Sequence, residues 1–174
     1  MKYIRLFENF NPEISVIIPE DNDDVIDLLH EVFGFIDSKE AIKSKILKRL
    51  NNGLSIKISY DGKIVGCYLL AEKSVNEFID DIENDKISDF RKSETSIDLP
   101  NDPGNYGIQG ISLAVLPEYR DLGLGKMMKD YVKGMGYDYI WGVQDKKLKN
   151  INFWEKSRDV FAESPTKYAT IEIF

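Results

Sequence analysis

The chain has 174 residues, 43% hydrophobic and 30% charged, values ordinary for one globular domain. A lone cysteine (Cys67) cannot form an internal disulfide and a lone histidine (His30) cannot build a histidine-rich metal site, while no apolar run approaches the roughly 18 residues of a membrane span. With 23 basic against 30 acidic residues the net charge is −7, which argues against nucleic-acid binding through a basic surface.

The charge is unevenly distributed along the chain. Residues 72–102 contain ten acidic and four basic residues, a net of −6, whereas residues 119–158 contain nine basic and five acidic residues, a net of +4. The pattern indicates either two ligands of opposite charge or two solvated faces, and the second interpretation is the simpler one.

The first eleven residues place apolar side chains three positions apart before Asn11-Pro12. They lack the apolar core and the small-residue cleavage site of a signal peptide. We therefore predict that residues 1–11 form a short amphipathic arm that packs on the domain.

The segment after the arm predicts one strand and two helices. Ile14–Ile18 is a β-branched run typical of a strand. A helix follows the capping residues Asp21 or Asn22 and ends at Gly34, and a second helix follows Ser38.

Two β-rich runs, 54–60 and 63–71, flank Asp61-Gly62. This dipeptide between such runs is typical of a type I′ hairpin, because both of its residues accept a positive φ.

Residues 72–107 form an acidic excursion between the hairpin and the next strand. Apolar residues at positions 75, 78, 79 and 82 have helical spacing, and the polar stretch after Phe90 reads as a loop. The remaining predicted elements are a strand over 108–115, a helix from near Gly123, a strand over 139–143, a helix over 148–157, and a hairpin of 159–163 with 168–174. Together they predict a single α/β domain over residues 12–174.

The most informative stretch runs from Ile111 to Lys133. An apolar strand ends at a proline, Arg120-Asp121-Leu122-Gly123-Leu124-Gly125 follows, and an amphipathic helix begins. Glycines let a ligand approach the backbone, and the first amides of a helix are unpaired and favour anions such as phosphate. Arg120 and Lys126 add positive charge at the same place. A structural glycine-rich turn is the alternative.

Other phosphate-binding motifs fit this stretch less well. A dinucleotide-binding fingerprint needs a third glycine where Met128 stands. A P-loop needs serine or threonine after Gly125-Lys126, where Met127 stands.

The stretch resembles the acyl-CoA-binding core of the GNAT N-acetyltransferase superfamily, whose signature is Arg/Gln-x-x-Gly-x-Gly/Ala. The segment that precedes the signature in the family is matched closely here by Val115-Leu116-Pro117-Glu118-Tyr119-Arg120. The resemblance implies a mixed twisted sheet flanked by helices, with a splayed central strand pair that accepts the pantetheine arm. Gly110, inside the preceding strand, fits a bulge that bends it, and close packing is the alternative reason for a glycine there.

The resemblance also implies acetyl-CoA as cosubstrate, without a metal. Main-chain groups near Leu113 and Val115 would pair with pantetheine, and amides of the signature would hold the diphosphate. Asn150 and Trp154 would lie beside pantetheine, although a helix-surface role for the first and a core role for the second stay open. The implied cofactor-binding residues are Leu113, Val115, Arg120, Asp121, Leu122, Gly123, Leu124, Gly125, Lys126, Asn150 and Trp154.

The chain departs from the family pattern at the catalytic groups. Tyr106 to Leu116 contains no carboxylate where many relatives carry a glutamate base, and Gln109 and Ser112 can only order a water. Trp154 stands where relatives carry a tyrosine acid. The candidates left are Asp98, Asp102 and Glu94 as the base, and Tyr106, Tyr119, Tyr131 and Tyr168 as the acid.

The function implied is transfer of an acetyl group from acetyl-CoA to a primary amine, cationic in view of the acidic excursion. The acceptor is a small molecule, or a lysine or N-terminus of a protein, and the expected location is the cytoplasm. The alternative is a CoA-binding or acyl-CoA-binding module without turnover.

Overall fold

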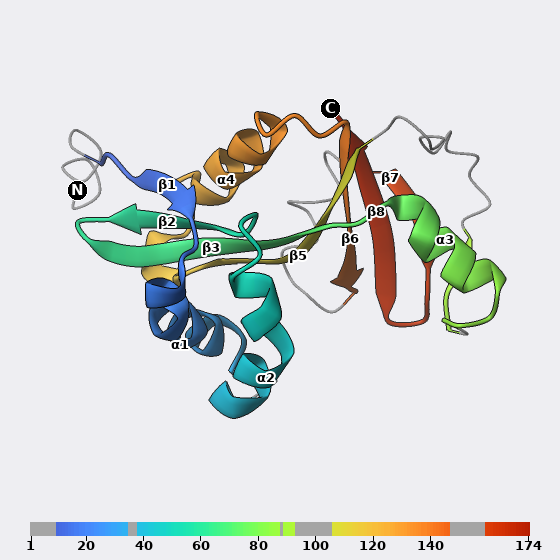
Figure 1. Ribbon diagram of the computed structural model, residues 1–174, viewed down its shortest axis with the longest axis horizontal. Coiled ribbons are helices and arrows are strands. Elements are labelled where there is room, and N and C mark those ends of the chain that lie inside the picture. The colour runs from blue at the N-terminus through green and yellow to red at the C-terminus, as the bar shows by residue number, and fades with distance from the viewer. Residues whose placement is uncertain (1–9, 35–37, 88, 93–105, 147–158) are drawn as a thin grey trace. The chain divides into compact units, whose positions relative to one another are not determined.

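The computed structural model describes residues 10–34, 38–87, 89–92, 106–146 and 159–174 (Figure 1). The chain divides into two compact units. Unit 1 comprises Met1–Leu70 and Ser112–Tyr131, and unit 2 comprises Ala71–Ile111 and Val132–Phe174. The single domain over residues 12–174 stays a prediction.

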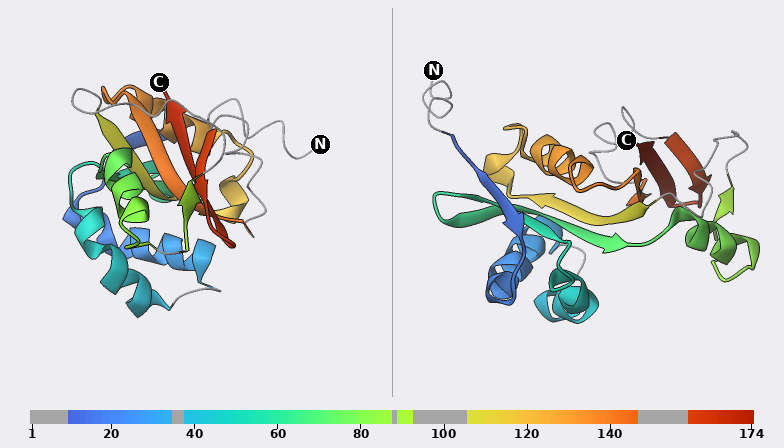
Figure 2. Two further views of the ribbon diagram at one scale, coloured as in Figure 1. Left: turned by 90° about the vertical axis from the view of Figure 1, so that its right-hand side faces the viewer. Right: turned by 45° about the horizontal axis from the view of Figure 1, so that its top comes forward.

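In unit 1 the strand order is β1-β2-β3-β5, with β1/β2 and β2/β3 antiparallel. Figures 1 and 2 show α1 and α2 on one face of these strands and α4 on the other. The elements that contribute to this unit are β1 (Glu13–Val16), η2 (Pro19–Asp21), α1 (Asn22–Phe33), α2 (Lys39–Leu50), β2 (Ile56–Tyr60), β3 (Lys63–Glu72), β5 (Gly107–Val115), η3 (Pro117–Tyr119) and α4 (Leu124–Lys133).

The predicted cap of α2 and the predicted turn between β2 and β3 are both present in unit 1. The Ser38 hydroxyl caps α2 by accepting a hydrogen bond from the Ala41 amide at 3.2 Å. Asp61 and Gly62 both have positive φ, 50° and 74°, which fits the predicted type I′ turn between β2 and β3.

The start of α1 differs from the prediction. The Asp21 side chain caps no amide of α1. Its carboxylate instead accepts the Ile18 amide at 2.9 Å and pairs with Lys57 of β2, with both charged side chains largely buried. At the other end of α1, Gly34 keeps a right-handed φ of −61°, and a Cβ there would lie 2.1 Å from the His30 carbonyl oxygen.

In unit 2 the strand order is β5-β6-β8-β7-β4, in which β5 and β6 are parallel and the other pairs antiparallel. The sheet is therefore mixed, and the predicted α/β class is confirmed. The two-residue β4 was not predicted; it pairs with Ala162 and Glu163. The further elements of this unit are α3 (Val75–Glu83), β4 (Arg91–Lys92), β6 (Tyr139–Asp145), β7 (Asp159–Glu163) and β8 (Lys167–Ile173).

Aromatic residues form the core of unit 2. Phe78 of α3 lies 5.1 Å from Trp141 and 6.1 Å from Phe161, ring centroid to ring centroid. The buried rings also fix the start of α3. The Tyr139 hydroxyl accepts a hydrogen bond from the Val75 amide at 3.0 Å, and the Trp141 indole donates one to the Lys73 carbonyl at 2.8 Å. This helix is therefore held at its first residue as well as along its apolar face.

Candidate functional site

The strand before the signature presents one of its edges away from β3. The Leu116 amide donates to the Val65 carbonyl of β3 at 2.9 Å. Because main-chain groups of successive residues in a strand point to opposite edges, those of Leu113 and Val115 point away from β3.

The parallel pairing of β5 with β6 is short. The register joins Gly107 to Tyr139, Ile108 to Ile140 and Gln109 to Trp141. Both strands continue beyond these pairs, to Val115 and Asp145, with no further pair between β5 and β6 in the described part of the chain. Beyond Gln109 this edge of β5 therefore has no β6 partner among the described residues, and the splay of the central strand pair stays a prediction.

The signature is a loop that turns sharply before α4. Asp121 has a φ of 63° and Gly123 a φ of 78°. The left-handed region is unstrained for glycine and costs other residues free energy, which explains a glycine at 123. A Cβ at Gly123 would meet no described atom within 4 Å, so the space beside this residue is open.

The amides at the start of α4 are available to a ligand. In the described part of the chain, the first amide of this helix to find a main-chain acceptor is that of Met127, which donates to the Gly123 carbonyl at 3.0 Å. The preceding amides carry the partial positive charge of the helix N-terminus. The loop therefore has main-chain geometry that an anion can use, while its binding of a diphosphate stays a prediction.

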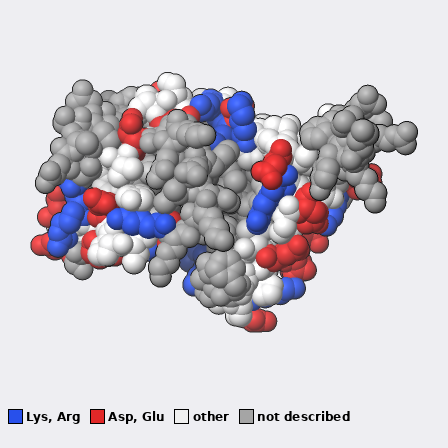
Figure 3. All heavy atoms as spheres, turned by 180° about the vertical axis from the view of Figure 1, so that it is seen from behind, with Lys and Arg blue, Asp and Glu red and all other residues white. Residues whose placement is uncertain are grey.

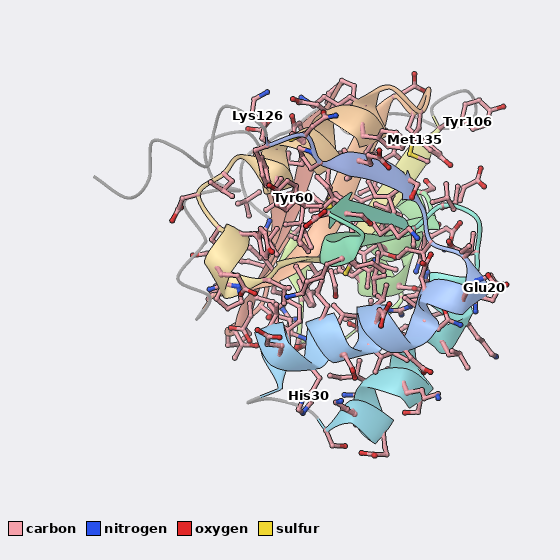
Figure 4. All side chains as sticks on the ribbon, turned by 90° about the vertical axis from the view of Figure 1, so that its left-hand side faces the viewer. Glu20, His30, Tyr60, Tyr106, Lys126 and Met135 are labelled. Carbon is pink, nitrogen blue, oxygen red and sulfur yellow. The ribbon has the colours of Figure 1, made fainter. Side chains whose placement is uncertain are left out.

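The two basic side chains of the signature are both exposed. The Arg120 guanidinium donates from Nε to the Val115 carbonyl at 3.3 Å, which ties the loop back to the end of β5. Lys126 forms an ion pair with Asp130 at 2.6 Å and extends away from the ribbon in Figure 4. Arg120 thus occupies one of the carbonyls that the sequence assigned to pantetheine.

The proton-transfer candidates are only partly described. Tyr106 directly precedes β5, at the opposite end of that strand from Val115, and its side chain points outward in Figure 4. Its amide donates to the Asp138 carboxylate at 2.7 Å. Glu94, Asp98, Asp102, Asn150 and Trp154 lie outside the described residues.

Sequence reasoning missed a set of side chains that contacts the entry of the signature. Lys63 of β3 lies 3.4 Å from the Glu118 carboxylate and 5.7 Å from the ring centroid of Tyr119. A hydrogen bond from its own amide, together with Lys63, lowers the pKa of Glu118 below its ordinary value. The contact joins residues 55 positions apart, so no local pattern could have indicated it.

A comparison with protein families matches residues 22–159 to the acetyltransferase (GNAT) family. The chain belongs to the GNAT family. The match covers most of the sequence and includes the strand, loop and helix described above. The predicted resemblance is confirmed, and the protein is an acyltransferase of the N-acetyltransferase class.

Solved GNAT structures share the fold. A GNAT-family acetyltransferase from Streptococcus agalactiae aligns with a TM-score of 0.72 at 12% identity, over 94% of this chain and 95% of that chain. PaiA N-acetyltransferase from Thermoplasma acidophilum, solved in complex with coenzyme A, aligns with a TM-score of 0.60 at 14% identity, over 94% and 99%. A polyamine N-acetyltransferase from Drosophila melanogaster aligns with a TM-score of 0.65 at 9% identity, over 94% of this chain and 100% of that chain. No curated protein matches the sequence.

Two further findings concern this GNAT chain. Its described residues contain no group of three or more His, Cys, Asp or Glu side chains placed to hold a metal ion. Among the described helices, none has the length and apolar character needed to span a membrane. The cytoplasmic location stays a prediction.

Proposed function

We propose that this GNAT protein transfers the acetyl group of acetyl-CoA to a primary amine by direct attack on the thioester. The observation that carries the proposal is the loop of residues 120–126, where a left-handed turn at Gly123 precedes helix amides without main-chain acceptors in the described chain. These amides suit a diphosphate, the group that every acyl-CoA carries next to its nucleotide.

The main-chain edge of β5 supports the placement of the pantetheine arm. Leu113 lies on the edge that faces away from β3, beyond the last residue that pairs with β6. Pantetheine carries two amides, so it can pair with such an edge as an added strand does. Since the Val115 carbonyl already accepts from Arg120, we expect Leu113 and the Val115 amide to make the stronger hydrogen bonds.

The proposed reaction joins the amine nitrogen to the thioester carbonyl carbon and breaks the carbon–sulfur bond. The attacking amine must first lose a proton, which costs roughly 4.6 kcal/mol at pH 7 for a lysine-like amine. The departing thiolate takes up a proton in turn, and its pKa of about 8.5 means that it needs little help to leave.

Water is the most plausible first acceptor of the amine proton along β5. The strand contains no carboxylate, and Gln109 is the last residue paired with β6, half-buried opposite Trp141. A side-chain amide at this position can hold a water by hydrogen bonds without binding the proton itself. Asp98 and Asp102 stay candidates for the final base.

The expected acceptor is a cationic amine, either a small molecule or a lysine or N-terminus of a protein. The support is the negative charge of α3, where Glu77 and Asp80 are exposed, together with the fold shared with a polyamine N-acetyltransferase. Attraction between opposite charges raises the rate at which such substrates reach the protein.

A second candidate function is acyl-CoA binding without turnover. The specific observation in its favour is the carboxylate-free strand between Tyr106 and Leu116. Such a protein would use the same loop but would lack an efficient path for the amine proton.

A turnover assay separates the two functions. The protein is incubated with acetyl-CoA and a panel of polyamines, aminoglycosides and lysine peptides from pH 7 to 9, and released CoA thiol is followed. Amine-dependent thiol release that rises with pH supports the acetyltransferase. Acetyl-CoA binding without thiol release supports the binding module, and absence of acetyl-CoA binding contradicts both.

A further inference from the structure

The turn that leads into the signature loop is held against the end of the β2–β3 hairpin. The Tyr119 ring of η3 lies 6.2 Å from the Tyr60 ring, edge to face, at 62°. Lys63, just beyond the hairpin turn, places its ammonium near the Tyr119 ring and the Glu118 carboxylate. All of these residues lie in unit 1.

The aromatic contact extends to Phe10, three residues before the start of β1. The Phe10 ring lies 4.6 Å from the Tyr60 ring, so Tyr60 makes ring contacts with both Phe10 and Tyr119. Tyr60 is labelled in Figure 4, which views the hairpin end of the molecule. Three segments far apart in sequence therefore meet at this one side chain.

The rings account for most of the attachment. The Lys63 and Glu118 side chains are 58% and 52% exposed, and an ion pair this exposed contributes little to stability. Tyr60 and Tyr119 are half-buried, and aromatic pairs in such settings contribute beyond the area they bury.

The attachment point is adjacent to the anion-binding loop. Tyr119 directly precedes Arg120, and the left-handed residues Asp121 and Gly123 follow within four positions. Over so short a link, displacement of the Tyr119 backbone displaces the amides that we assign to the diphosphate.

We propose that Tyr60 is a positioning residue for cosubstrate binding, acting through Tyr119 and supported by Phe10. It touches no reacting atom; it holds η3 so that the loop keeps its binding conformation before the ligand arrives. The cosubstrate part of this inference rests on the proposed function, whereas the structural part concerns the protein without ligand.

The test uses Tyr60→Ala, Tyr60→Phe and Phe10→Ala. Phe33→Ala is the matched control, because Phe33 is a half-buried aromatic residue of the same unit at the end of α1. If Tyr60→Ala does not fold, Phe10→Ala removes the other ring contact of Tyr60 and carries the same test.

The first measurement is amide hydrogen exchange without ligand. The Tyr119, Arg120 and Met127 amides are each hydrogen-bonded in the present structure. We expect these amides to exchange several-fold faster in Tyr60→Ala than in wild type or Phe33→Ala, with wild-type rates restored in Tyr60→Phe. Unchanged exchange at these amides would overturn the proposal, whether or not the protein binds acetyl-CoA.

The second measurement is steady-state kinetics. The KM for acetyl-CoA should rise about threefold to tenfold in Tyr60→Ala and less in Phe10→Ala, with kcat at saturation within twofold of wild type. A fall in kcat with unchanged KM would contradict the positioning role. If wild-type protein fails to bind acetyl-CoA, the proposed function fails while the exchange result still decides the structural part.

Discussion

A single missing side chain permits the packing at the start of β5. Gly107 pairs with Tyr139, and a Cβ on Gly107 would lie 2.3 Å from the Tyr139 ring. The same ring supplies the hydroxyl that accepts the Val75 amide, so it cannot move away without loss of that hydrogen bond. The glycine is required here for space and not for its backbone conformation.

Gly107→Ala should therefore lower the free energy of unfolding by about 1–3 kcal/mol, through overpacking against Tyr139. Chemical denaturation measures the change. A loss below about 0.5 kcal/mol, the size typical of neutral surface changes, would contradict the close packing seen at this position.

Cys67 lies fully buried in β3. Burial raises the pKa of its thiol from 9.0 to about 12. The folded thiol therefore stays protonated between these values, whereas the thiol of the unfolded chain ionises. Its contribution to stability is complete below pH 9 and decreases as the pH rises toward 12.

We expect folded protein to resist a thiol reagent at pH 8 and to react with one equivalent once denatured. The loss of unfolding free energy between pH 8 and pH 10.5 should be smaller in Cys67→Ala than in wild type. Rapid labelling of folded protein at pH 8 would show that the thiol is accessible.

At the scale of elements, the sequence indicated the signature loop better than its surroundings. Glycine at 123 and the apolar spacing of the next helix are local signals, and the structure has a left-handed turn at the first and a helix at the second. On α4, Leu124, Met128 and Val132 are buried, whereas the adjacent apolar residues Met127 and Tyr131 are 37% and 40% exposed. Helix spacing alone could not separate adjacent apolar residues.

Elements that depend on distant partners escaped prediction. The two residues of β4 form a strand because β7 lies beside them, not because of their own propensity. Asp21 has the type and position of a helix cap, yet the ammonium of Lys57, 36 residues away, attracts its carboxylate.

The signature loop offers a matched pair of substitutions. Gly123 and Gly53 have φ values of 78° and 75°, and a Cβ on either would meet no described atom within 4 Å. Alanine at either position should therefore cost a similar free energy, about 1–2 kcal/mol. Only Gly123 belongs to the proposed diphosphate site.

Gly123→Ala should weaken acetyl-CoA binding tenfold or more, while Gly53→Ala should leave it within twofold of wild type. Titration calorimetry on both variants measures the difference. Equal losses of affinity would mean that general destabilisation, rather than the shape of the loop, accounts for the effect.

For the whole molecule, charge is the property most directly linked to the acceptor. On the face drawn in Figure 3, basic and acidic side chains lie interspersed over much of the surface. On α3, the pairing of Asp81 with Lys86 and of Glu83 with Lys92 reduces the local excess of negative charge. Glu77 and Asp80 are therefore the better positions to test than the paired carboxylates.

The double variant Glu77→Gln/Asp80→Asn should raise the KM for a cationic amine about twofold to fivefold at low salt and leave acetyl-CoA affinity unchanged. At high salt the KM of the variant should equal that of wild type, because salt screens the charges. Glu13→Gln/Glu20→Gln removes the same charge from exposed positions of unit 1 and serves as control. An equal effect in both variants would indicate a response to net charge alone.

The sharpest test of the account is a titration of isotope-labelled protein with acetyl-CoA, followed by the amide resonances of residues 122–126. These amides should show the largest shifts, CoA should cause the same shifts, and a pantetheine lacking the nucleotide should not. Saturable binding of acetyl-CoA with these five resonances unmoved would contradict it.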